Sequence, residues 1–218
     1  KTPPQIFNRF GVLIIFFFAL IFFFYHLFFQ NFDLFSAIKV SLFYVVSIVS
    51  STGFDLQVNG LGMLPTIIFI FLMFIGGCSA SSSTGLKIVR VIVLLRYIPV
   101  SLKRIFHPRA IIPVRYNGKA LRDESVRLIF GFFFLFLLLF IAGAFLLSIF
   151  GNGFIASLSL SAAAISNMGP IMGSIAQGFE YADLNLVSKY VLIVLMLIGR
   201  LEIYAFFALF SKSVWSRN

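Results

Sequence analysis

The hydrophobic residues of the chain fall into long, nearly unbroken blocks that are separated by short polar stretches. Two blocks, 34–49 and 154–165, are about half a bilayer long and predict re-entrant helices that enter the membrane without crossing it. Four longer blocks have the roughly 20 apolar residues that a membrane-spanning helix needs, and they cover residues 10–29, 62–98, 127–150 and 186–210. The order of elements is therefore span, short helix, span, repeated twice.

The two halves of the chain share one register. Gly53 follows the first short helix and Gly169 follows the second, 116 positions later. Phe10 and Val126, where the two opening spans begin, have the same offset. Because both halves begin on the same side of the membrane, the sequence predicts two parallel repeats around an axis normal to the bilayer.

Composition supports an integral membrane protein. Of 218 residues, 61% are hydrophobic and 31 are Phe, more apolar side chains than a soluble domain of this length can bury. The predicted fold class is therefore all-α integral membrane, with two parallel repeats of span, short helix and span, and with a broken second span. The predicted organisation is a first repeat over 1–98, a basic linker over 99–125 and a second repeat over 126–218.

The basic residues orient this topology. Residues 96–127 carry eight of the 17 Lys and Arg, whereas residues 151–185 carry none. Basic loops stay on the cytoplasmic side, so the linker is expected inside and both short helices are expected to enter from outside. This account explains the net charge of +10 without nucleic acid, which is not expected as a partner.

A polar turn follows each short helix. The sequences are SSTGFD at 50–55 and SNMGPI at 166–171. Non-helical backbone at membrane depth must face protein or a water-filled cavity, where successive carbonyls can bind a dehydrated cation. An ordinary glycine-capped helix end is the alternative interpretation, and the matching register of two such turns favours the ion filter.

Five motifs together resemble the Trk/Ktr/HKT superfamily of potassium transporters, and its bacterial TrkH branch most closely. They are SSTGF at 50–54, GGCSASSSTGLKIVR at 76–90, HPRAIIPVR at 107–115, NMGP at 167–170 and GRLE at 199–202. The match is to the C-terminal half of such a transporter, its third and fourth repeats, and it implies potassium-channel-like span–pore-helix–span repeats. We therefore expect the remaining repeats to precede Lys1 in the native gene, in preference to two copies completing one pore.

The resemblance implies one filter glycine per repeat, Gly53 and Gly169. It places potassium at Thr52, Gly53, Met168 and Gly169. The complete set of implied filter residues is Ser51, Thr52, Gly53, Phe54, Asn167, Met168, Gly169 and Pro170. The chain departs from the family at Ile171, where a glycine is usual, and this leaves the geometry of the second filter open.

The second span is interrupted by small and mostly polar residues. Such a run has low helix propensity, although small residues also make tight contacts between membrane helices. Thr84 follows Gly53 by 31 positions, as Arg200 follows Gly169, so we expect the interruption and a mid-span Arg200 at similar depth. The hypothesis is a gate below the filter, made of Gly76, Gly77, Ser81, Ser82, Ser83, Thr84, Gly85 and Arg200.

These features predict potassium uptake across the plasma (inner) membrane by a multi-pass protein. Potassium is the cargo, and no cofactor is expected. The resemblance also implies a homodimer and a cytoplasmic nucleotide-binding regulatory subunit as partner. The rival classes are an intramembrane enzyme, for which the sequence offers no catalytic geometry, and a non-transporting regulatory membrane subunit.

Overall fold

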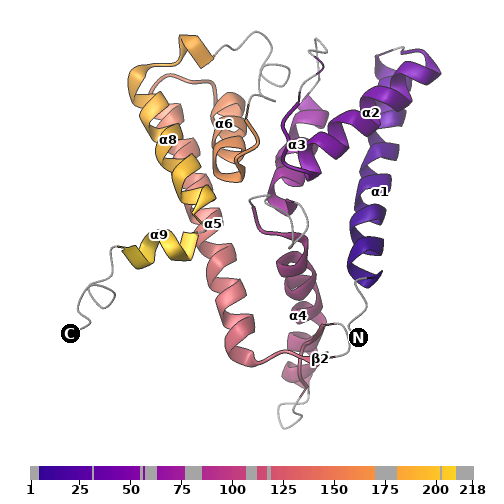
Figure 1. Cartoon of the computed structure of the whole chain (residues 1–218), viewed down its shortest axis with the longest axis vertical. Coiled ribbons are helices and arrows are strands. Elements are labelled where there is room, and N and C mark those ends of the chain that lie inside the picture. The colour runs from indigo at the N-terminus through magenta and orange to yellow at the C-terminus, as the bar shows by residue number, and fades with distance from the viewer. Residues whose placement is uncertain are drawn as a thin grey trace.

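The computed structural model describes residues 5–30, 32–54, 56, 63–76, 85–106, 112–116, 119–169, 181–201 and 203–209. These residues form a helical bundle with one short β-hairpin (Figure 1). In chain order the elements are α1 (Gln5–Phe29), α2 (Leu34–Val49), α3 (Met63–Ile75), α4 (Ile88–Phe106), β1 (Arg115–Tyr116), β2 (Lys119–Ala120), α5 (Asp123–Ile149), α6 (Phe154–Ser166), the 3-10 turn η1 (Tyr181–Asp183), α8 (Leu186–Arg200) and α9 (Ile203–Leu209).

The two predicted short helices are α2 and α6. Both lie at one end of the bundle, and the β-hairpin lies at the opposite end (Figure 1). α2 packs on α1, while α6 packs on α5, α8 and α3. Two hydroxyls of α6 donate to backbone carbonyls, Ser161 to Phe140 at 2.8 Å and Ser157 to Asn152 at 3.3 Å. These two hydroxyls of the short helix are thus paired within the protein, as an apolar surrounding favours.

The second predicted span is two helices. α3 ends at Ile75 and α4 begins at Ile88, and in Figure 1 the two are stacked end to end. The break falls on the predicted polar interruption. α4 runs past Pro99 to Phe106, beyond the end expected from the apolar block.

The fourth predicted span, by contrast, is not continuous. α8 ends at Arg200 and α9 leaves it in another direction, so the prediction of one continuous helix over 186–210 is wrong. After the break, α9 packs on α5. The Tyr204 hydroxyl donates to the Leu128 carbonyl at 2.6 Å and occupies the space that a side chain at Gly131 would need.

α5 is, among the described residues, the one helix long and apolar enough to cross a membrane. Its outer face carries large exposed apolar side chains, including Leu128, Phe134 and Phe145, each more than 60% exposed. A contiguous apolar surface of this kind is typical of a helix that faces lipid or another protein.

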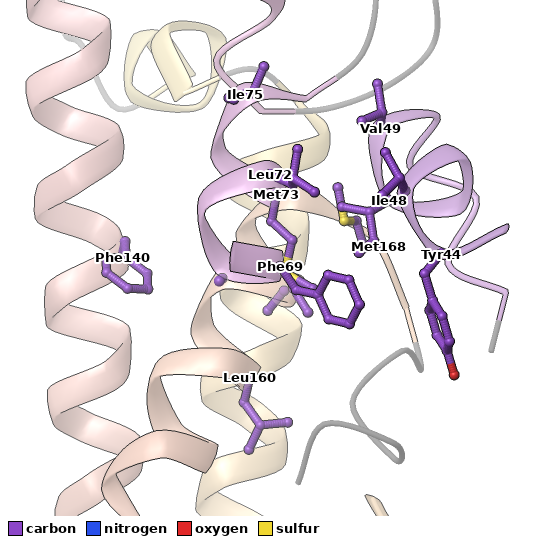
Figure 2. Packing of buried hydrophobic residues seen from close by; sticks show 14 of the residues in the cluster. Tyr44, Ile48, Val49, Phe69, Leu72, Met73, Ile75, Phe140, Leu160 and Met168 are labelled. Atoms are coloured by element: carbon purple, nitrogen blue, oxygen red, sulfur yellow. The ribbon is translucent and has the colours of Figure 1, made fainter. Parts of the chain in front are cut away.

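The buried core joins the two halves of the chain. Tyr44 and Ile48 of α2 pack with Phe69 and Leu72 of α3 and with Leu160 of α6 (Figure 2). Aromatic contacts support it, since the Tyr44 and Phe69 rings are 5.5 Å apart between centroids. This core holds the C-terminal ends of both short helices close to α3.

Candidate functional site

The turn after α2 is a defined hydrogen-bonded helix end. The Thr52 amide donates to the Ser47 carbonyl at 3.0 Å, and the Ser51 amide donates to the Ile48 carbonyl at 3.0 Å. This pair of bonds is the Schellman motif, in which the residue after the helix adopts a left-handed conformation. Ser51 has φ 55° and Gly53 has φ 74°, so the chain reverses direction directly after the helix.

The turn after α6 repeats this geometry 116 positions later. The Met168 amide donates to Ala163 at 3.0 Å, and the Asn167 amide donates to Ala164 at 3.1 Å. Asn167 has φ 51° and Gly169 has φ 73°. The two turns therefore have the same bonds at equivalent positions and nearly the same dihedrals, as the shared register of the sequence predicts.

The two turns also touch. A Cβ atom at Gly53 would collide with the Met168 carbonyl oxygen, and it would lie 2.8 Å from the Met168 carbonyl carbon. Met168 is buried, with its side chain near Ile48 and Met73 (Figure 2). Two separate constraints thus favour glycine at position 53: the positive φ of the backbone, and the close approach of the second turn.

Side chains hold the first turn in place. The Ser47 hydroxyl donates to the Phe54 carbonyl at 2.9 Å, which closes the turn back onto its own helix. The hydroxyls of Ser50 and Thr52 are 2.6 Å apart and share a hydrogen bond. All of these contacts lie within the first repeat.

The second turn is held from outside its own helix. The Asn167 side-chain amide donates to the Met196 carbonyl of α8 at 3.1 Å. The Tyr181 hydroxyl of η1 donates to the Gly169 carbonyl at 3.3 Å. Burial raises the pKa of Tyr181 to about 12, so its hydroxyl keeps the proton that it donates.

The chemistry offered by this arrangement is cation binding by backbone oxygen. Both helices direct their C-terminal ends, which carry partial negative charge, at the paired turns. A carbonyl oxygen has two lone pairs, so Gly169 can accept from Tyr181 and still face an ion. Of the predicted filter residues, Ser51, Thr52, Gly53, Phe54, Asn167, Met168 and Gly169 lie in these turns, and Pro170 lies outside the described residues.

The end of α3 is closed by three hydrogen bonds at the break. The last carbonyls of a helix have no partner within it and need donors from elsewhere. Here the donors come from the loop's own ends and from α6: the Gly76 amide to Leu72 at 3.2 Å, the Ser166 hydroxyl to Met73 at 3.1 Å, and the Leu86 amide to Phe74 at 3.2 Å.

The candidate gate loop leaves α3 and returns to the same point. A Cβ at Gly85 would lie 3.3 Å from the Met73 carbonyl oxygen and 3.5 Å from the Gly76 Cα atom. Gly76 and Gly85 both have positive φ, 63° and 105°. The remaining predicted loop residues lie outside the described part of the chain: Gly77, Ser81, Ser82, Ser83 and Thr84.

Arg200 is the last residue of α8. Its neighbour Gly199 approaches the end of α6 so closely that a Cβ there would collide with the Ile165 carbonyl and lie 2.7 Å from the Asn167 amide nitrogen. Arg200 therefore follows directly on the contact between α8 and the second turn.

Sequence reasoning missed two residues that contact these sites. Ser166 lies directly before the second turn, but its partner Met73 is 93 positions away and no local pattern links them. Tyr181 is the first residue of η1. A tyrosine between two predicted apolar helices was the one signal in the sequence that could have pointed to it.

Comparison with known proteins agrees with this fold. The family model described as TrkH, cation transport protein, matches residues 9–217. The Trk system potassium uptake protein TrkH of Vibrio parahaemolyticus is 34% identical over 184 residues, covering 83% of this chain and 37% of that protein. The Escherichia coli K12 protein of the same name is 31% identical over 181 residues, covering 82% and 37%.

A solved structure gives the same result. The crystal structure of the potassium transporter TrkH from Vibrio parahaemolyticus matches with a TM-score of 0.83 and 32% identity, over 94% of this chain and 44% of that one. The chain thus spans less than half the length of these relatives.

The match to the TrkH structure and to the family model defines a helical membrane protein with a transporter fold. The family match covers nearly the whole chain, and on that ground the chain belongs to the TrkH family of cation transport proteins. This classification excludes the enzyme alternative.

Proposed function

We propose that the protein takes up potassium across the plasma (inner) membrane through a pore lined by the two turns. The observation that carries this proposal is that two helix ends with equivalent hydrogen bonds and matching left-handed residues meet at Gly53 and Met168. Carbonyls of Thr52, Gly53, Met168 and Gly169 would replace water around a dehydrated potassium ion. Relatives that cover most of this chain are named potassium uptake proteins.

The two repeats would form half of a fourfold pore, in parallel orientation around one axis. α2 and α6 lie at the same end of the bundle, away from the hairpin of the basic linker, which supports entry of both short helices from the outer side. We further propose a homodimer and a cytoplasmic nucleotide-binding subunit that docks on this linker.

The proposed gate is the loop from Gly76 to Gly85 together with Arg200. Its support is that both ends of the loop close on the last turn of α3, where Ser166, the residue before the second turn, donates to Met73. Loop and filter thus share one hydrogen-bonded junction. Arg200 beside the loop would repel cations while the gate is closed, since an arginine at membrane depth needs polar groups or water around it.

Rubidium uptake tests the proposal. A host without its own potassium uptake systems would express the full-length protein and be starved of potassium before tracer is added. We expect saturable rubidium uptake that excess potassium inhibits, and growth at low potassium. Uptake equal to that of the empty-vector control, with the protein present in the membrane, would favour a regulatory subunit over a transporter.

A further inference from the structure

A groove runs between α4 and α5 on the side of the basic linker. It consists of two cavities that share Phe130 of α5 as a wall. One, of about 380 Å³, has mixed walls in which Arg104, Asp123 and Arg127 supply the charge; we call it the polar cavity. The other, of about 400 Å³, is lined only by apolar side chains and extends to the break between α3 and α4. Each volume is in the range of a small-molecule site.

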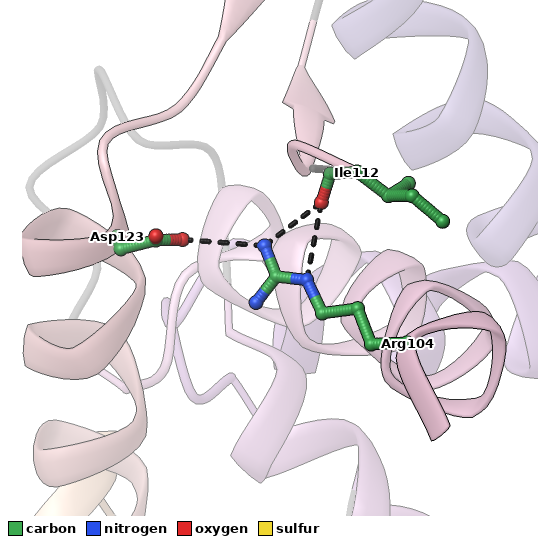
Figure 3. Close-up of polar contacts among 3 residues, drawn as sticks. All are labelled: Arg104, Ile112 and Asp123. Carbon is green, nitrogen blue, oxygen red and sulfur yellow. Dashed lines mark hydrogen bonds and ion pairs between the residues drawn. The ribbon is translucent and has the colours of Figure 1, made fainter. Parts of the chain in front are cut away.

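The polar cavity has a surplus of positive charge. Arg104 is already engaged, with two hydrogen bonds to the Ile112 carbonyl at 3.2 and 2.8 Å and an ion pair to Asp123 at 3.4 Å (Figure 3). Asp123 is therefore largely neutralised. Arg127 lies one turn further along α5 and is exposed, and no hydrogen bond or ion pair to its guanidinium occurs within the described chain. The cation open to a ligand is thus Arg127.

The apolar cavity continues from this charge toward the middle of the bundle. Tyr97 and Phe130 stand where the two cavities join, with ring centroids 4.7 Å apart. Beyond them the walls include Leu95 and Phe133, and the far end is formed by Ile75 and Leu86. A ligand that fills both cavities must carry a negative charge at one end and a long apolar chain at the other.

We infer that this groove binds an anionic glycerophospholipid, with its phosphate at Arg127 and an acyl chain between α4 and α5. Basic pockets between membrane helices at the cytoplasmic side are suited to anionic headgroups. The order of polar and apolar walls follows the order of headgroup and chain in a bilayer leaflet. Buried acyl CH₂ groups add affinity in proportion to their number.

The bound chain would act on the gate. Ile75 and Leu86 are the described residues that flank the break, and the Leu86 amide donates to Phe74, which also lines the cavity. An acyl chain there would support the junction on which both ends of the loop close. This consequence rests on the proposed function, whereas lipid binding itself does not.

Native mass spectrometry of the full-length protein in detergent, titrated with dioleoyl-phosphatidylglycerol, tests the site. Arg127→Ala is expected to weaken binding about fivefold, the usual effect of one basic residue at a membrane surface. The matched control is Arg122→Ala, because Arg122 is also exposed but does not line the cavity. Equal weakening by both variants would reflect general surface charge and overturn the proposal.

A second pair of variants tests the acyl chain. Leu95→Trp would fill the apolar cavity and should weaken phosphatidylglycerol binding, whereas Leu102→Trp, equally exposed on α4 at 53% but outside the cavity, should not. Equal binding by these two variants would contradict the site. So would disulfide cross-linking of Leu95→Cys between two copies, in a full-length background from which Cys78 and every other cysteine have been removed, because it would show that protein covers the groove. Rubidium uptake is measured separately, so failure here leaves the transport proposal untouched.

Discussion

Replacing Gly53 by alanine tests the contact between the two turns. The residue has φ 74°, and its added Cβ would collide with the Met168 carbonyl. Two other glycines separate these effects. Gly169 has φ 73° but no described atom within 4 Å of its Cβ position, and Gly153 has φ −55° and equally open space.

The magnitudes follow from these geometries. A left-handed conformation costs a residue with a Cβ about 1–2 kcal/mol, and an overpacked contact costs about 1–3 kcal/mol more. Gly53→Ala should therefore destabilise its turn by about 2–5 kcal/mol and Gly169→Ala by about 1–2 kcal/mol. Gly153→Ala should have little effect, because neither term applies to it.

The assay measures rubidium uptake into proteoliposomes and compares its inhibition by potassium with its inhibition by sodium, which gives the potassium-over-sodium preference. Thermal unfolding is measured in parallel. We expect the preference to fall in the order Gly153→Ala, Gly169→Ala, Gly53→Ala, with Gly153→Ala close to wild type. A Gly53→Ala protein as selective as Gly153→Ala would refute the contact between the turns.

Three further variants probe the junction, the outer support of the filter and the gate. Ser166→Ala removes the hydroxyl that donates to the buried Met73 carbonyl, at a cost of about 1 kcal/mol, and should change both thermal stability and open probability; a change in stability alone would argue against coupling. Tyr181→Phe should lower selectivity, and Tyr190→Phe, on the exposed face of α8, should not. Because the pKa of Tyr181 is raised to about 12, wild-type selectivity should persist at pH 10, where an ordinary tyrosine is half ionised and could no longer donate; loss of selectivity there would contradict the buried hydrogen bond. Arg200→Ala should raise cation flux in single-channel or flux recordings, and unchanged flux would remove it from the gate.

Local patterns predicted the short helices closely. Residues 34–49 were expected and α2 spans Leu34–Val49, while 154–165 were expected and α6 spans Phe154–Ser166. Each is an apolar run that ends at polar or glycine-containing turns, which is the information that sets helix boundaries. The sequence also placed Gly53 and Gly169 in the turns after these helices, and both have positive φ, as do Ser51 and Asn167, which no glycine signal marked.

Contacts between distant segments could not be predicted from such patterns. Apart from Glu202 the sequence stays apolar after Arg200, and the packing of α9 on α5 through the bond of Tyr204 to Leu128 is visible only in the structure. Strands β1 and β2 were missed although Asn117-Gly118, a frequent hairpin pair, stands between them in the sequence. The Ser166–Met73 bond depends on the packing of α6 against α3, which no single segment encodes.

The most direct test of an ion filter at the paired turns is a structure of the full-length protein in rubidium, with anomalous diffraction data. We expect an anomalous peak on the pore axis, within coordination distance of carbonyls at Thr52, Gly53, Met168 and Gly169. The peak should be lost in sodium alone. Rubidium transport without any peak at these turns would contradict an ion filter there.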